Sequence, residues 1–314
     1  MCECRVATMA VDKTHEGLRA LRPNVDVRAS TLNFFSYLCS AMEQLPTIDV
    51  VIATHRPEGI RRVETMDAPA LPGVRYIVSW QNHADAPVPE TLLKRSDMEI
   101  YRLEEQGVSS NRNNAIDHAS AEVILVLDDD VTIFPEGILA LQEYYRDHPE
   151  AEFLTYRTLP LHRKVYPKVE TPLCLPLPKG YYGTGIELSF RLKTGLRFCP
   201  DLGPGGGRYD GGEDEAIVLA AIHRGLDCRY IPVTVCAHPH PSTGTKATLT
   251  DDNLRASGLV IALQYPWSAW LRVPLKAWRN ARRGRAGFLR ALFLSIKGAV
   301  AAPRLRRRNR DTLW

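Results

Sequence analysis

Short apolar runs recur along the first half of the chain and are separated by polar segments of helical length. The runs cover residues 48–54, 74–80, 98–103 and 122–127. Each is long enough for one buried strand. Between them, residues 58–66 and 109–119 have helical composition, and the second segment begins with a serine. The alternation of strand and helix predicts an α/β fold with a mostly parallel central sheet flanked by helices.

Polar residues follow three of these predicted strands. Thr54 and Arg56 come at the end of the first strand, Gln81 follows the second, and three aspartates at 128–130 follow the fourth. Ligands of such sheets bind beyond the carboxyl ends of the strands. Consecutive carboxylates repel one another unless a cation neutralises them, and hard oxygen ligands suit magnesium or manganese. The alternative is a solvated acidic turn that caps a helix beginning near Pro135.

A second acidic cluster lies at residues 211–215, which read GGEDE and precede a helical run at 216–223. The glycines allow a close backbone approach, and a helix N-terminus favours nearby anions. A carboxylate held near a substrate hydroxyl can remove its proton as the oxygen attacks. Either Glu213 or Asp214 can fill this role, and helix capping alone is the alternative.

Two histidines follow a further predicted strand at residues 229–235. They are His238 and His240, and the prolines at 239 and 241 keep this segment extended. A neutral imidazole can complete a metal shell that contains aspartates. His238 is therefore a candidate metal ligand.

Composition is that of an ordinary enzyme of 314 residues, of which 45% are hydrophobic. The seven cysteines are scattered without the paired spacing of a zinc site, and their odd number favours reduced thiols. Residues 1–30 contain no continuous apolar stretch, so no signal peptide is predicted. These features predict a cytoplasmic protein.

The formal net charge of +4 conceals two regions of opposite sign. From Asn253 onward there are 14 Lys or Arg and one acid, which leaves 26 basic and 35 acidic residues before it. The basic region also holds Phe288, Leu292 and Ile296 at four-residue spacing, which predicts an amphipathic helix. Charged residues interrupt its apolar runs, so they are too short to cross a membrane.

Three interpretations of this basic tail remain open. Its apolar stripe can pack back on the body, or it can bind an anionic membrane surface. Nucleic acid is the third candidate, but no recognisable nucleic-acid motif is present, so no nucleic-acid partner is predicted.

In order and spacing, several motifs resemble those of glycosyltransferase family 2. They are VVIAT at 50–54, GVSSNRN at 107–113, LDDD at 127–130, GTG at 183–185 and GEDE at 212–215, followed by His238. The resemblance extends from residue 48 to about residue 240 and implies a GT-A fold. Family members often have an acidic residue after the second strand, where this chain has Gln81 and its neighbours.

The resemblance also implies roles for individual residues. It implies a nucleotide-sugar site that includes Thr54, Arg56, Arg112 and Asp128. We add Gln81 and Asp129 to this predicted site, since they follow the second and fourth predicted strands. It implies Asp130 and His238 as metal ligands, with Gly183, Thr184, Gly185 and Glu213 facing the donor sugar and the acceptor. Between the two candidate bases, it favours Asp214.

The expected activity is metal-dependent transfer of a hexose from a UDP-sugar to a hydroxyl of a glycan or lipid-linked glycan, in surface polysaccharide synthesis. The metal is manganese or magnesium, and direct displacement with one base predicts inversion. The expected location is the inner face of the cell membrane. Two alternatives are a sugar-phosphate nucleotidyltransferase and a non-catalytic carbohydrate-binding scaffold.

The expected organisation has four parts. Residues 1–47 are an N-terminal extension, 48–150 the nucleotide-sugar half, 151–245 the acceptor-binding and catalytic half, and 246–314 the basic amphipathic tail.

Overall fold

The computed structural model describes residues 45–159, 166–178, 183–206, 208–238 and 248–313. His240 and most of the predicted N-terminal extension lie outside these residues.

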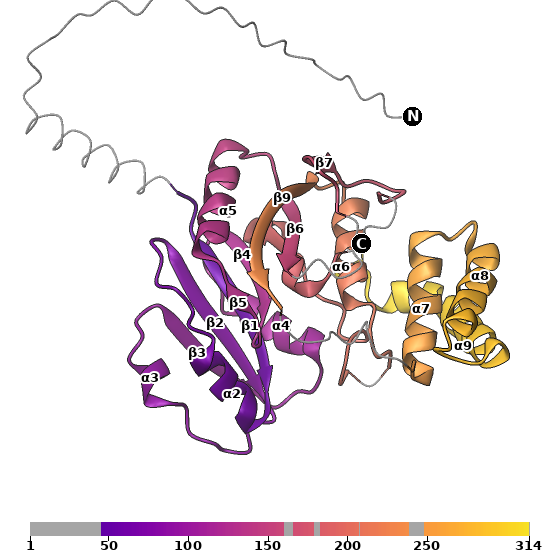
Figure 1. Cartoon of the computed structure of the whole chain (residues 1–314), viewed down its shortest axis with the longest axis horizontal. Coiled ribbons are helices and arrows are strands. Elements are labelled where there is room, and N and C mark those ends of the chain that lie inside the picture. Colours follow the sequence, from indigo (N-terminus) through magenta and orange to yellow (C-terminus); the bar gives the residue numbers. More distant parts are fainter. Residues whose placement is uncertain (1–44, 160–165, 179–182, 207, 239–247, 314) are drawn as a thin grey trace, which may run out of the picture. The chain divides into compact units, whose positions relative to one another are not determined.

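Four parallel strands form one half of a central sheet (Figure 1). They are β1 (Ile48–His55), β2 (Val74–Gln81), β3 (Met98–Leu103) and β4 (Val123–Asp128). Their order is β3-β2-β1-β4, and every neighbouring pair is parallel. Each predicted strand lies within one residue of its observed bounds. In β1, every residue from Ile48 to Ile52 is fully buried, as expected of a strand covered on both faces.

The other half of the sheet is mixed. It contains β5 (Thr132–Ile133), β6 (Phe153–Leu159), β7 (Thr171–Pro172), β8 (Leu188–Arg191) and β9 (Cys228–Ala237). Strand β8 lies between β4 and β6 and is antiparallel to both, whereas β9 is parallel to β6. Strands β5 and β7 both pair antiparallel with β9. The predicted α/β fold with a mostly parallel sheet is confirmed, with β8 as the antiparallel connection between its halves.

Helices cover both faces of the sheet. They are α2 (Arg56–Thr65), α3 (Glu90–Leu93), α4 (Val108–Asp117), α5 (Pro135–Asp147) and α6 (Glu213–His223), with short 3-10 turns η1 (Gly185–Glu187) and η2 (Leu192–Thr194). Ile60 of α2 and Leu141 of α5 belong to one core. Ile116 of α4 and Ile217 of α6 belong to the core on the opposite face. The result is a helix–sheet–helix sandwich, in which each helix buries one apolar face.

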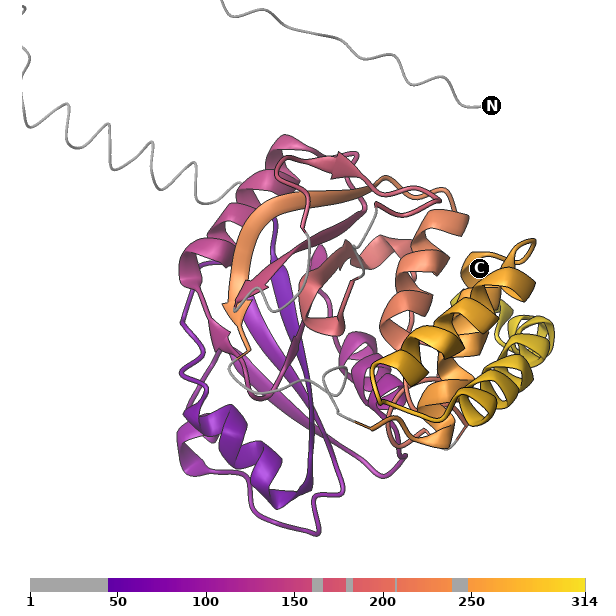
Figure 2. The same cartoon turned by 45° about the vertical axis from the view of Figure 1, so that its right-hand side comes forward.

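Four C-terminal helices form a layer beside α6 (Figure 2). They are α7 (Asp251–Gln264), α8 (Ala269–Arg282), α9 (Phe288–Arg308) and α10 (Arg310–Leu313). Leu259, Leu305 and Leu313 pack in one core with Leu219 of α6. Helices α7 and α9 approach closely, because a Cβ on Gly258 would lie 1.8 Å from the carbonyl oxygen of Ser295.

The C-terminal layer packs on the body and also presents apolar side chains to solvent. The buried face of α9 includes Ala291, Leu294 and Leu305. Of the stripe predicted from the sequence, Phe288 is 41% exposed and Ile296 is 46% exposed, whereas Leu292 is partly buried against a core cluster. The neighbouring Leu289 and Phe293 are 77% and 59% exposed. Among the described helices, none is long and apolar enough to span a membrane.

Candidate active site

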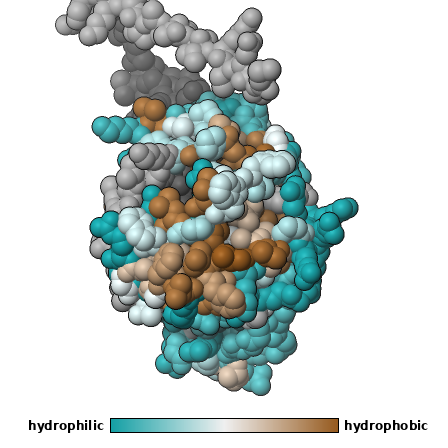
Figure 3. Space-filling view, turned by 90° about the vertical axis from the view of Figure 1, so that its right-hand side faces the viewer, coloured by the Kyte–Doolittle hydropathy of each residue, from teal (hydrophilic) through white to brown (hydrophobic). Residues whose placement is uncertain are grey.

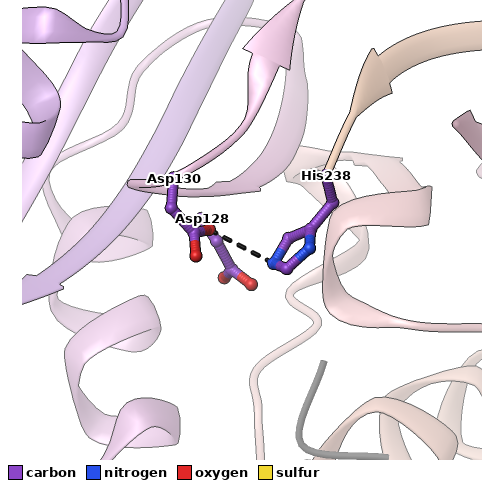
Figure 4. Close-up of side chains that lie close together, drawn as sticks. All are labelled: Asp128, Asp130 and His238. Carbon is purple, nitrogen blue, oxygen red and sulfur yellow. Dashed lines mark ion pairs between the residues drawn. The ribbon is translucent and has the colours of Figure 1, made fainter. Parts of the chain in front are cut away.

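The acidic turn after β4 and the end of β9 meet at one point (Figure 4). Asp128, Asp130 and His238 each offer a ligand atom, and these atoms all lie within 4.8 Å of one another. The Nε2 atom of His238 lies 3.3 Å from Oδ1 of Asp130. Pairing of β5 with the end of β9 brings His238 to this turn, because Thr132 lies opposite Ala237 in the register. Two carboxylates and one imidazole form a donor set suited to manganese or magnesium.

Asp129 lies apart from this cluster. Its carboxylate accepts hydrogen bonds from Arg62 Nη2 at 2.8 Å and from the hydroxyl of Thr54. Burial raises the pKa of Asp129, although both hydrogen bonds oppose that change. Gly59 makes this contact possible, because a Cβ there would lie 2.1 Å from the Thr54 hydroxyl. Asp129 and Thr54 therefore join the acidic turn to β1 and α2, and sequence reasoning missed the part played by Arg62.

Arg112 of α4 lies between the two acidic motifs. Its Nη2 atom lies 2.9 Å from Oδ1 of Asp128, and its Nη1 atom lies 2.9 Å from Oδ1 of Asp214. The side chain is only 4% exposed. Burial alone would lower the pKa of Arg112, but the charges of the neighbouring carboxylates outweigh burial and raise it. The guanidinium therefore remains charged and compensates both carboxylates.

Glu213 and Asp214 occupy the first turn of α6. The chain enters this turn through Gly212, whose φ of 91° favours glycine. Burial raises the pKa of Glu213 to about 8, and the charge of Asp214 acts in the same direction. Burial also raises the pKa of Asp214, whereas Arg112 and a backbone hydrogen bond from Gly185 oppose the change. A carboxylate with a raised pKa is better suited to general-base chemistry than one in water.

Residues 183–187 include Gly185, whose backbone packs against the Arg112 guanidinium. A Cβ on Gly185 would lie 2.3 Å from Nη2 of Arg112, so only glycine fits against the guanidinium. The backbone N–H of Thr184 donates to Glu187, and this fully buried carboxylate also accepts a 2.9 Å hydrogen bond from Thr158. A Cβ on Gly183 would lie 3.1 Å from Val218 of α6. The 183–185 segment thus lies close to the second acidic motif.

Gln81 is the last residue of β2, and Arg56 directly follows β1. The Gln81 amide donates to the carbonyl oxygen of Gly107 at 3.1 Å, which fixes the loop that leads into α4. The side chain of Arg56 is exposed, and its carbonyl oxygen accepts a 2.8 Å hydrogen bond from Trp80. Asn111 of α4 donates to the Thr54 carbonyl oxygen at 2.9 Å. These bonds fix the ends of β1 and β2 relative to α4.

A glycine-rich loop before α6 completes the surroundings of Glu213. The backbone N–H of Val108 donates to the carbonyl oxygen of Pro204 at 3.0 Å. A Cβ on Gly203 would lie 3.2 Å from the Glu213 carboxyl carbon. At the start of the loop, the Asp201 carboxylate lies 2.9 Å from Nε of Arg208 and accepts a 2.9 Å hydrogen bond from Asn309 beyond α9. The loop therefore contacts α4, α6 and the C-terminal layer.

Comparison with known proteins agrees with this geometry. A family model described as glycosyl transferase family 2 matches residues 84–198, which include α4, the acidic turn and Gly185. No curated protein sequence matches the chain.

Solved structures with the same fold include those of S. aureus TarS. A TarS structure is 15% identical with a TM-score of 0.50, and the match covers 74% of this chain and 42% of that chain. TarS 1–349 in complex with UDP-GlcNAc is 13% identical with a TM-score of 0.52, covering 85% of this chain and 88% of that one. TarS 1–349 in complex with UDP is 11% identical with a TM-score of 0.53, covering 82% and 91%. This chain thus spans less than half of the longer TarS chain.

The family model confirms the resemblance to glycosyltransferase family 2 over residues 84–198. The likeness to the TarS structures confirms the predicted α/β fold of GT-A type.

Proposed function

We propose that this enzyme transfers a hexose from a UDP-sugar to a hydroxyl of a glycan or lipid-linked glycan, with inversion and with a divalent metal. The observation that carries the proposal is the position of Arg112, bonded to Asp128 on one side and to Asp214 on the other. One buried cation thus joins a candidate donor site to a candidate base. Direct displacement requires the two substrates to be bound close together, and this link places the two sites side by side.

The donor occupies the carboxyl ends of β1, β2 and β4 in this proposal. Thr54, Arg56, Gln81 and the acidic turn border that region. Asp128 contacts the nucleoside, and Asp129 supports the turn through Thr54 and Arg62. The choice of UDP is supported by the TarS 1–349 structures, which were solved with UDP-GlcNAc and with UDP.

Asp130 and His238 hold manganese or magnesium, with Asp128 beside them. The residues fit such an ion, because their ligand atoms lie within 4.8 Å of one another and combine hard oxygen with imidazole nitrogen. When bound, the ion supplies positive charge that stabilises the diphosphate leaving group.

Asp214 removes the proton from the acceptor hydroxyl as that oxygen attacks the anomeric carbon. Arg112 fixes the carboxylate by a 2.9 Å hydrogen bond, and its charge opposes the rise in the pKa of Asp214 that burial causes. Glu213 contacts the acceptor, and residues 183–185 bound the space for the sugars. A single base with direct displacement gives inversion, by the logic that applies to hydrolysis of glycosides.

The proposal also assigns a role to each part of the chain. Residues 48–150 form the nucleotide-sugar half, and residues 151–245 form the acceptor half. The C-terminal helices attach the enzyme to the inner face of the cell membrane. Exposed tryptophans and a strongly basic composition in these helices favour an anionic membrane and hence a lipid-linked acceptor of surface polysaccharide synthesis.

Calorimetric titration with UDP, GDP, CDP and dTDP, each with and without manganese, tests the donor site. We expect manganese-dependent binding of UDP, lost in Asp130→Asn and retained in Asp117→Asn, an exposed aspartate at the end of α4. Absence of nucleotide binding by folded protein would favour the carbohydrate-binding scaffold. Formation of a nucleotide sugar from UTP and a sugar phosphate would instead identify a nucleotidyltransferase.

A further inference from the structure

An apolar groove of about 950 Å³ lies between α7, α8 and α9, outside the site described above. Its lining includes Leu263 of α7, Trp270 and Val273 of α8, and Ile296 and Val300 of α9. Ligand sites in proteins typically have volumes of roughly 300–1,000 Å³. The groove is therefore large enough for part of an amphiphilic molecule.

The groove differs in character along its length. On α9 its lining runs from Ile296 through Val300 and Pro303 to Arg306 and Arg307, and Arg310 follows beyond the helix. At a rise of about 1.5 Å per residue, the stretch from Ile296 to Arg307 is about 16 Å long. One end is thus apolar and the other carries guanidinium groups, which suit phosphate. Among the described residues that line the groove, none is acidic.

The surface around the groove has the composition of a membrane interface. Figure 3 faces the C-terminal layer and shows apolar residues gathered on it with hydrophilic residues around them. Trp267 is 92% exposed and Trp270 is 72% exposed. Two exposed aromatic rings are capped by cations, since Arg282 lies over Trp278 and Lys297 over Phe293. Aromatic rings and long basic side chains are favoured where an apolar phase meets water.

We propose that this groove binds one anionic phospholipid of the membrane, with an acyl chain along α9 and the phosphate at Arg306, Arg307 and Arg310. Charge complementarity supports this occupant, because the chain from Asn253 onward carries 14 basic residues and one acidic residue. The groove adds a defined lipid site to the membrane attachment described under the proposed function, on which this inference rests. It does not involve the residues assigned to the sugar donor.

The test uses monomeric dihexanoyl phosphatidylglycerol with the full chain, so that a bilayer is not needed. We expect saturable binding of one lipid per chain, about tenfold tighter than that of dihexanoyl phosphatidylcholine. Inorganic phosphate alone should not displace the lipid, because it lacks the acyl chain. UDP titration of the same samples reports separately on the donor site, so failure of one proposal is distinguished from failure of the other.

Two variants test the groove itself. Ala299→Trp fills it without changing charge, and the triple change of Arg306, Arg307 and Arg310 to Gln removes its cationic end. Each should weaken lipid binding by about tenfold or more. The matched control changes Arg272, Arg279 and Arg283 to Gln, which removes the same charge from exposed positions outside the groove. This control should alter binding by less than about twofold.

Unfolding curves establish whether each variant is folded. If Ala299→Trp does not fold, the change of Arg306, Arg307 and Arg310 to Gln tests the proposal by itself. Equal losses in the two arginine triples would indicate unspecific electrostatic attraction and overturn the proposal. A dimer that Ala299→Trp dissociates would assign the groove to a second copy of the chain and overturn it as well.

Discussion

Arg112 and Asp214 are joined by a 2.9 Å hydrogen bond, although 102 residues separate them in the sequence. The same guanidinium bonds to Asp128, so one buried cation links α4, the acidic turn after β4 and the first turn of α6. Burial costs Asp214 its solvation, and the charge of Arg112 opposes that cost. The geometry of the two acidic motifs therefore depends on one side chain.

Asp214→Asn should abolish sugar transfer and leave UDP binding unchanged. The amide preserves the shape and can still contact Arg112, but it cannot accept the acceptor's proton. Loss of a general base typically lowers kcat by about 10²–10⁴-fold. Steady-state transfer and calorimetric UDP titration measure the two quantities. Full transfer by this variant would exclude Asp214 as the base, and Asp117→Asn at the end of α4 is the control.

Gly185→Ala should lower kcat without unfolding the protein. Its Cβ would lie 2.3 Å from Nη2 of Arg112, so the guanidinium must move and its bonds to Asp128 and Asp214 must change. A displacement of this size in an active site can cost about 10²-fold in rate. Gly287→Ala is the control, because nothing lies within 4 Å of the Cβ it adds. Equal activity of the two variants would contradict the proposed dependence on Arg112.

The strands of the first half could be predicted from sequence for a simple physical reason. Parallel strands covered on both faces are nearly continuous apolar runs, and β1, β2 and β4 have that pattern. Strand β8 has only four residues and no distinctive pattern, so its antiparallel insertion between β4 and β6 had no local signal.

The contacts made by the side chains of the site could not be predicted from the sequence alone. Asp128 ends β4, and Asp129 and Asp130 lie in the turn that follows it. The turn brings Asp128 and Asp130 together and directs Asp129 toward Thr54, and three consecutive aspartates in the sequence do not indicate which of them converge. The pairing of Asp129 with Arg62 and the approach of Gly185 to Arg112 depend on tertiary packing, and no spacing in the chain indicates them.

Glu213 should make the metal-free protein less stable as the pH rises. Its pKa is raised from 4.5 to about 8 in the folded state. Below the unfolded pKa both states are protonated, so Glu213 contributes no pH dependence there. As the pH rises from about 4.5 to 8, the unfolded state ionises first and the free energy of unfolding falls.

Glu213→Gln should remove this decline. The difference in unfolding free energy between variant and wild type should grow by a few kcal/mol, as an order of magnitude, between about pH 5 and pH 8. Urea unfolding in the presence of a chelator measures it, and Glu143→Gln on the exposed side of α5 is the control. Parallel pH profiles for Glu213→Gln and wild type would show that burial does not raise the pKa of this carboxyl group.

Asp129→Asn and Asp130→Asn should have different effects although the two residues are adjacent. Asp130→Asn, like His238→Ala, removes a candidate ligand and should weaken manganese binding by at least about tenfold. Asp129→Asn weakens the contacts with Arg62 and Thr54, so it should cost about 1–2 kcal/mol of stability with little change in metal affinity. Manganese titration and urea unfolding of each variant separate the two effects. Equal loss of manganese affinity in both would place Asp129 in the metal site.

Trp267→Ser combined with Leu289→Ser should weaken binding to anionic vesicles and leave the fold intact. Both side chains are exposed, at 92% and 77%, so the change removes apolar surface that contacts no core. Deleting the whole C-terminal layer would be a poorer test, because Leu305 and Leu313 pack against α6 and their loss would expose that core. Burying one such side chain in an apolar phase contributes about 1.5–3 kcal/mol, which predicts at least about tenfold weaker binding. Leu93→Ser on α3, where the side chain is 67% exposed, is the matched control in a vesicle sedimentation assay. Since Leu93 lies outside the C-terminal layer, equal weakening by the control would indicate that the attachment is not made by these helices.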